Sequence, residues 1–258
     1  MKMKRILALI AILLPLAACH KETPAPKEKD VVFVSIKAFE TKARIGTNSL
    51  PSWSEGDTIG ILADGTDSPA EFTLRSGAGY SSASFEGVIP GDGPYVVYSP
   101  ASADCDGTTF QGILEMNISC KQPSQALGAL PLWGRARDLT DVHLESPCGM
   151  LRLNLKGSTT LKSITLDAGK PVSGAFLCNL TDGMFAMVGG ANIIMLDAAG
   201  AEIFTSEYTP FWFVLPPGEY DQLEFTITAT DGDITYFSVD DTVTIEAGVF
   251  SSLSLTIE

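Results

Sequence analysis

Residues 151–156 read Leu-Arg-Leu-Asn-Leu-Lys, and this stretch decides the fold class. Apolar and polar side chains alternate at every position, which places one face of a strand on a core and the other in water. The same alternation recurs at 223–228 (Leu-Glu-Phe-Thr-Ile-Thr) and at 252–257 (Ser-Leu-Ser-Leu-Thr-Ile). No amphipathic helical pattern follows the N-terminal stretch. The sequence therefore predicts an all-β protein.

Turn residues support many short strands. Thr230-Asp231-Gly232-Asp233 separates two β-prone runs, and an Asp-Gly turn in that position predicts a hairpin. The run 31–36, Val-Val-Phe-Val-Ser-Ile, is apolar at five of its six positions. It predicts a central strand that is covered on both faces.

Residues 121–140 are the poorest in strand signals, since they contain two prolines and two glycines. A connection here would divide the chain into two β-sandwich domains, residues 31–140 and 141–258. A single large sandwich with one long loop is the alternative.

The N-terminus has the layout of a lipoprotein signal. Basic residues precede a short apolar run, and Leu16-Ala17-Ala18 leads to Cys19. This lipobox pattern predicts removal of residues 1–18 and lipidation of Cys19. His20 follows where an aspartate would favour the inner membrane, so we expect attachment to outer-membrane lipid. Residues 19–30 are rich in proline and charge and predict a flexible tether.

The net charge is −14, and removal of the signal leaves 14 basic against 31 acidic residues, or −17. An acidic surface of this kind argues against nucleic acid as a partner.

Four cysteines remain beside Cys19, an even number in an exported chain. A disulfide between Cys105 and Cys120 is the favoured pairing, because the two flank one loop-and-strand segment. Four free thiols are the alternative, since Cys148 and Cys178 lie within apolar strands.

Residue types that carry catalysis are sparse. His143 is the only histidine beyond the tether, it is expected to face solvent, and no nucleophile motif accompanies it. Pairs of aspartates lie in turns, where they bond their own backbone. The sequence predicts no catalytic site, no metal site and no cofactor. Trp212, in Phe211-Trp212-Phe213, is a possible glycan contact if it is exposed, although a second covered face is the commoner explanation.

Several stretches resemble, in order, the fimbrillin-like lipoproteins, which are subunits of the type V pili of Gram-negative anaerobes. The matching motifs are Trp53-Ser-Glu-Gly-Asp-Thr-Ile-Gly-Ile61, Ala83-Ser84-Phe85, Tyr95-Val-Val-Tyr-Ser-Pro100, Cys148-Gly-Met-Leu-Arg-Leu153, Phe213-Val-Leu-Pro-Pro-Gly218 and the closing Ile245-Glu-Ala-Gly248.

This resemblance implies two transthyretin-like, Greek-key sandwiches in tandem and a role as a fimbrial subunit or adhesin on the outer membrane. It also implies assembly with like subunits by strand addition. A protease specific for Lys or Arg would cut after Arg44, or after Lys42, and release the lipid together with the first strand. The alternative is an anchored, monomeric lipoprotein that binds host or surface glycans.

Overall fold

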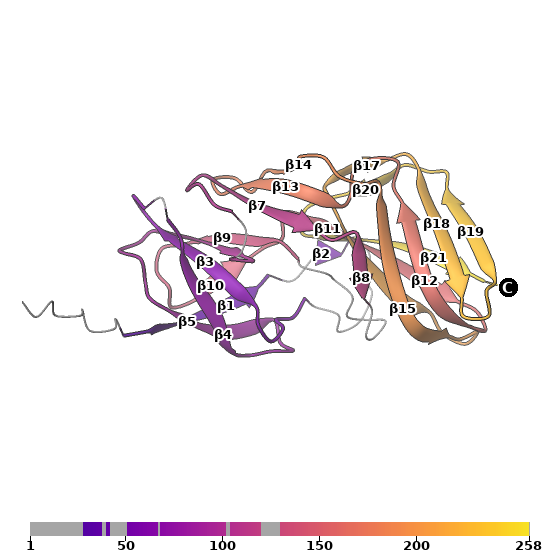
Figure 1. Ribbon diagram of the computed structural model, residues 1–258, viewed down its shortest axis with the longest axis horizontal. Coiled ribbons are helices and arrows are strands. Elements are labelled where there is room, and N and C mark those ends of the chain that lie inside the picture. Colours follow the sequence, from indigo (N-terminus) through magenta and orange to yellow (C-terminus); the bar gives the residue numbers. More distant parts are fainter. Residues whose placement is uncertain are drawn as a thin grey trace, which may run out of the picture.

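The computed structural model describes residues 28–37, 40–41, 51–66, 68–101, 104–119 and 130–257. Within these ranges every regular element is a β-strand, and twenty-one strands follow one another along the chain (Figure 1). The all-β prediction is confirmed for this part of the chain. In the same ranges, no helix has the length and apolar character that a membrane span requires.

The N-terminal half forms one seven-stranded sheet in the order β10-β1-β5-β4-β3-β6-β9. Its strands are β1 (Asp30–Ile36), β3 (Thr58–Ala63), β4 (Ala70–Ser76), β5 (Ser82–Gly87), β6 (Tyr95–Ser99), β9 (Leu132–Ala136) and β10 (Val142–Leu144).

This sheet curls until its two end strands meet. The backbone amides of Trp133, on β9, and Glu145, just after β10, each donate to the other's carbonyl at 2.9 Å. Every strand contributes side chains to one enclosed core. The N-terminal half is therefore a single sheet wrapped around its own core, not the pair of stacked sheets that the sandwich prediction requires.

The C-terminal half places two sheets face to face. One has the order β16-β11-β21-β2 and the other β19-β18-β12-β15-β8. Their bounds are β16 (Thr209–Leu215), β11 (Gly149–Lys156), β21 (Val249–Thr256), β2 (Glu40–Thr41), β19 (Ile234–Val239), β18 (Leu223–Ala229), β12 (Thr159–Asp167), β15 (Ile193–Ile203) and β8 (Asn117–Ser119).

Strand β11 shows why these sheets pack. Leu151, Leu153 and Leu155 are fully buried in the core between the two sheets, as the alternation predicts. Burying each leucine stabilises the fold by about 1.5–3 kcal/mol. β11 pairs with β16 on one side and with β21 on the other, so this core strand has neighbours at both edges.

Two smaller sheets complete the fold: β14 (Phe185–Met187), β13 (Gly174–Asn179) and β7 (Thr109–Leu114) form one, and β17 (Gly218–Tyr220) and β20 (Val243–Ile245) form the other. A third core cluster lies between the halves and joins Tyr98 and Phe110 from the N-terminal part to Phe176 and Trp212 from the C-terminal part.

Strand pairing crosses the predicted boundary between residues 140 and 141 in several places. β10, at 142–144, belongs to the N-terminal sheet, where it pairs with β1. Three strands from before the boundary pair instead with strands of the C-terminal half: β2 with β21, β7 with β13, and β8 with β15. The two halves are thus interlocked, because any single cut along the chain would separate strands that pair with each other.

Candidate functional site

β1 occupies an interior position in the N-terminal sheet. It runs antiparallel to β5, with Val32 opposite Phe85, and parallel to β10, with Val34 opposite Val142. Both flanking strands come from later parts of the chain. Departure of β1 would therefore open a gap in the middle of the sheet, with two rows of unpaired backbone groups facing it.

Only one face of β1 is covered. Val32 and Val34 are 1% and 2% exposed and Ile36 is buried with them, whereas Phe33 is 60% exposed. The prediction of a central strand is confirmed, but the prediction that both faces are covered is wrong. The reason is the curl of the sheet, which encloses one core and leaves the outer face of β1 in solvent.

Polar contacts hold β1 at both ends. Lys29 Nζ lies 3.1 Å from Glu86 Oε1, and Lys37 Nζ lies 3.3 Å from Glu145 Oε2. All four side chains are substantially exposed, so each pair contributes only about 0–1 kcal/mol. The apolar face and the two backbone ladders therefore provide most of the attachment of β1.

A third polar contact joins β1 to β10. Ser35 Oγ lies 2.6 Å from His143 Nδ1, and His143 Nε2 lies 3.3 Å from Asp141 Oδ2. In a hydrolase triad the serine faces Nε2 and the aspartate faces Nδ1, which is the reverse of this order. His143 is solvent-exposed, as the sequence predicts. The arrangement serves to tie two neighbouring strands together.

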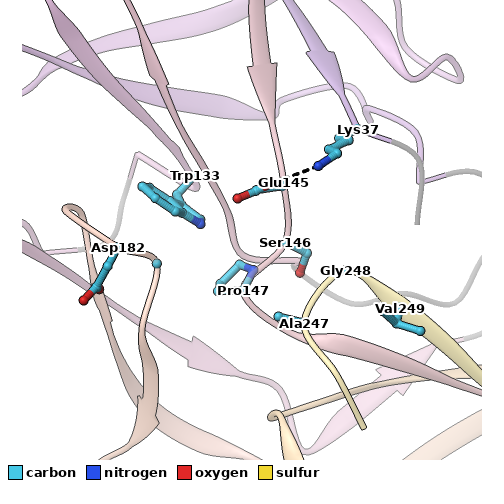
Figure 2. Close-up of a pocket in the computed structure, with 10 residues that line it drawn as sticks. Lys37, Trp133, Glu145, Ser146, Pro147, Asp182, Ala247, Gly248 and Val249 are labelled. Carbon is cyan, nitrogen blue, oxygen red and sulfur yellow. Dashed lines mark hydrogen bonds and ion pairs between the residues drawn. The ribbon is translucent and has the colours of Figure 1, made fainter. Parts of the chain in front are cut away.

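A pocket of about 250 Å³ lies beside the end of β1. Figure 2 shows Trp133, Glu145, Pro147 and Asp182 around it, with Lys37 bonded to Glu145 at one side. Trp133 comes from β9 and Asp182 from the β13–β14 turn, so both halves of the chain contribute to its wall. Gly183 (φ +74°) lies so close to the Trp133 ring that an added Cβ would come within 2.5 Å of it.

The chain crosses from one half to the other directly after β1. β2 runs parallel to β21, with Glu40 opposite Val249 and Thr41 opposite Phe250. β21 pairs with β11 along one edge, and β2 lies along its other edge only as far as Phe250. In the described ranges, no other strand pairs with β21 along that second edge. Leu253 and Leu255 of β21 pack against the core but stay only partly buried. The N-terminal segment thus holds positions in two different sheets.

The structure covers some of the predicted site residues and not others. Cys19, Lys42, Arg44 and Cys120 lie outside the described residues, so lipidation, processing and the Cys105–Cys120 disulfide stay predictions. Cys105 is half-buried and has a free thiol.

Trp212 is buried. The aromatic stretch 211–213 is therefore covered on both faces, which was the commoner of the two explanations considered. It is 4% exposed and packs against Phe250 with ring centroids 5.0 Å apart. The Arg152 guanidinium lies 5.5 Å from the Trp212 ring centroid. In this conformation the indole offers no free face to a sugar ring, and a glycan contact through Trp212 stays untested.

The two remaining thiols are buried and free in the third core cluster. Burial raises the pKa of Cys178 to about 12, and burial also raises the pKa of Cys148 well above its ordinary value. Both thiols are therefore protonated at neutral pH, which makes them poor nucleophiles and poor metal ligands.

The turn aspartates bond their own backbone, as expected. Asp106 accepts from the backbone amides of Thr108 and Thr109 at 2.9 and 2.7 Å. Across the residues that the structure describes, no group of three or more His, Cys, Asp or Glu side chains is arranged to hold a metal ion.

Sequence reasoning missed the paired ends of β1. Lys29 and Lys37 bracket the apolar run 31–36, and each meets a glutamate, Glu86 in β5 and Glu145 just after β10. The bracketing is visible in the sequence, but the acidic partners are not, because they lie 57 and 108 residues away along the chain.

Comparison with known proteins gives matches at the level of structure. No family model matches the chain, and no curated protein matches it. A candidate cell adhesion protein of Bacteroides ovatus shares the fold with a TM-score of 0.56 and 12% identity, over 89% of this chain and 93% of that one. A candidate cell adhesion protein of Bacteroides uniformis gives a TM-score of 0.51 and 17% identity, over 88% and 92%.

A tip fimbrial protein of Porphyromonas gingivalis also matches, with a TM-score of 0.38 and 12% identity over 81% of this chain and 82% of that one. The last likeness is too distant to support an argument. The first two establish a shared fold along nearly the whole length of both chains. That fold agrees with the fimbrillin-like resemblance found in the sequence.

Proposed function

We propose that this chain is a cell-surface lipoprotein that acts as a fimbrial subunit or adhesin and joins its neighbours by strand addition at the place of β1. The observation that supports this most directly is the interior position of β1, between two strands that lie far from it in sequence. The structural neighbours, which are described as cell adhesion proteins, point to the same role.

The proposed sequence of events starts at the membrane. Cys19 carries the lipid and brings the folded chain to the outer surface, and two or three acyl chains provide stable anchoring. Cleavage after Arg44, or after Lys42, then separates the segment that holds the lipid, β1 and β2 from the rest of the chain.

Loss of this segment would uncover the place of β1 in the N-terminal sheet and of β2 beside β21. An incoming strand would regain the backbone ladders to β5 and β10 and fill the three places of Val32, Val34 and Ile36 with apolar side chains. Main-chain bonds then provide affinity, and the alternate apolar positions provide register and specificity.

Limited proteolysis of the purified mature chain tests this proposal. Trypsin should release a fragment that begins at Ile45, and this fragment should form ladders on unheated, non-reducing gels. A double variant, Lys42→Ala with Arg44→Ala, is the matched control and should stay monomeric. N-terminal sequencing of the form found on the cell surface identifies the processed end. A fragment that begins at Ile45 and stays monomeric would contradict assembly.

A further inference from the structure

β19 ends the five-stranded sheet. It pairs with β18 alone among the strands that the structure describes, and it lies at the outer edge of the C-terminal half (Figure 1). Its sequence, Ile-Thr-Tyr-Phe-Ser-Val, has no charged residue and is rich in β-formers. An edge strand of this composition offers its backbone for pairing with another chain.

The hairpin geometry shows which backbone groups are free to pair. The Ala229 amide donates to the Asp233 carbonyl at 2.9 Å, and Gly232 (φ +101°) closes the turn, as the Asp-Gly motif predicts. Antiparallel pairs alternate, so Thr235, Phe237 and Val239 direct their N–H and C=O groups toward β18.

The backbone groups of Ile234, Tyr236 and Ser238 therefore point away from the sheet. The side chains of Ile234 and Tyr236 are 51% and 75% exposed on its outer face. The free edge thus combines unpaired backbone groups with apolar side chains that a partner could cover.

The usual protections of an edge strand are missing from β19. It contains no proline and no lysine, and its register with β18 has no bulge. Instead, exposed aspartates bracket it, Asp231 and Asp233 before the strand and Asp240 and Asp241 after it.

These aspartates act against pairing between two copies of the chain. Antiparallel pairing of β19 with itself, centred on Tyr236, would place Asp231 opposite Asp241 of the second copy at both ends of the ladder. Parallel pairing is offset by one residue and would place Asp240 of one copy opposite Asp241 of the other. Like charges that face each other across a ladder destabilise it.

We infer that β19 is a docking edge for an extended partner segment that has a basic residue at each end of about six β-prone residues. Backbone bonds along Ile234, Tyr236 and Ser238 hold the segment, and the two aspartate pairs select its charged ends. The inference does not depend on the proposed release of β1.

The fold itself contains a strand with this layout. Lys29 and Lys37 bracket the β-prone run of β1, and each meets a carboxylate beside that strand, Glu86 and Glu145. The two lysines are eight positions apart, and Asp233 and Asp240 are seven positions apart. The difference of one residue is about 3.3 Å, which a lysine side chain can span.

A peptide with the sequence of residues 29–37 that carries Asp30→Asn, acetylated and amidated, is therefore a suitable probe, because its charges are those of the two terminal lysines. In the intact chain the place of this sequence beside β5 and β10 is already filled. We expect fluorescence anisotropy to detect binding that weakens with added salt. We also expect backbone hydrogen exchange to slow within 234–239 when the peptide is present.

Two variants test the two parts of the inference. Conversion of Asp231, Asp233, Asp240 and Asp241 to asparagine should weaken binding about tenfold and remove most of its salt dependence. Tyr236→Pro removes an N–H that faces away from the sheet and should abolish binding, with circular dichroism to check that the fold persists. Glu202→Gln with Glu207→Gln, on the same half of the chain, controls for loss of negative charge in general.

The inference is overturned if the peptide does not bind the wild-type chain. It is also overturned if the four-asparagine variant binds as well as the control variant, or if protection by the peptide falls outside 234–239. Self-association of the wild-type chain through β19 would equally contradict selection of a basic partner.

Discussion

At the scale of single residues, Gly183 is placed where both its backbone and its missing side chain matter. Its φ of +74° lies in the left-handed region, and the Trp133 ring occupies the space that a Cβ would need. Gly232 has a φ of +101°, but no atom lies within 4 Å of the point that a Cβ would occupy there. Its backbone conformation therefore favours glycine, but the space beside it does not.

We therefore expect Gly183→Ala to destabilise the chain more than Gly232→Ala. Both substitutions carry the backbone cost of about 1 kcal/mol, and overpacking against the indole adds about 1–3 kcal/mol at position 183 alone. Urea unfolding of the two variants measures the difference. An equal loss of unfolding free energy in the two variants would show that the Trp133 ring shifts without cost.

Asp106 gives the chain a defined response to acid. Hydrogen bonds from the backbone amides of Thr109 and Thr108, with help from their hydroxyls, lower the pKa of Asp106 to about 2 from an ordinary value of 3.8. A carboxyl with a lowered pKa stabilises the folded state at pH above 3.8, and this contribution disappears as the pH falls toward 2.

Asp106→Asn should therefore flatten the loss of stability between pH 4 and about 2, compared with wild type. Unfolding curves across this pH range provide the measurement. Glu202→Gln serves as the control for removal of one exposed carboxyl. An unchanged slope in the Asp106 variant would mean that the turn forms in the unfolded chain as well.

At the scale of elements, β1 determines whether the N-terminal sheet is complete. Val31 on β1 lies opposite Glu86 on β5 in an antiparallel pair. The Cα atoms of such pairs are about 4.5–5.5 Å apart, within the range that a disulfide accepts. A cysteine at each position should lock β1 in place under oxidising conditions.

The double variant Val31→Cys/Glu86→Cys should thus block ladder formation after trypsin treatment, and a reducing agent should restore it. The single variant Val31→Cys controls for the added thiol, since the chain already has free cysteines. Ladders of the oxidised double variant would exclude β1 as the strand that is replaced.

The elements also show how far the sequence could predict the fold. Alternation identified β11, β18 and β21, and the Asp-Gly motif identified the hairpin that joins β18 to β19. These signals are local, because they depend on the period of a strand or on a turn of four residues. The buried position of Trp212 and the exposed face of Phe33 depend on which sheet covers which, and no local period contains that information.

At the scale of the whole molecule, the interlocking of the two halves was beyond prediction for the same reason. The β7–β13 pairing joins Phe110 to Cys178, and the β1–β10 pairing joins Val34 to Val142. The paired residues lie far apart in the sequence, so loop closure and tertiary packing decide which strands pair. The proline and glycine content of residues 121–140 predicted a domain boundary there, but it contains no information about strands that pair across that boundary.

The acidic surplus of the chain, in contrast, follows from composition alone. A net charge of −14 favours solubility and opposes association of identical acidic surfaces. In the proposed assembly, contacts between copies would therefore depend on burial and on backbone pairing, which strand addition provides.

The bridge between Trp133 and Glu145 has a kinetic consequence. It holds β10 from the side opposite β1, while β4 holds β5, so both walls of the gap would stay fixed if β1 were released. In the proposed assembly the receiving subunit then has little conformational entropy to lose, and the ordering cost falls on the incoming strand. The flexibility of the donor, and not the refolding of the acceptor, would set the rate at which subunits join.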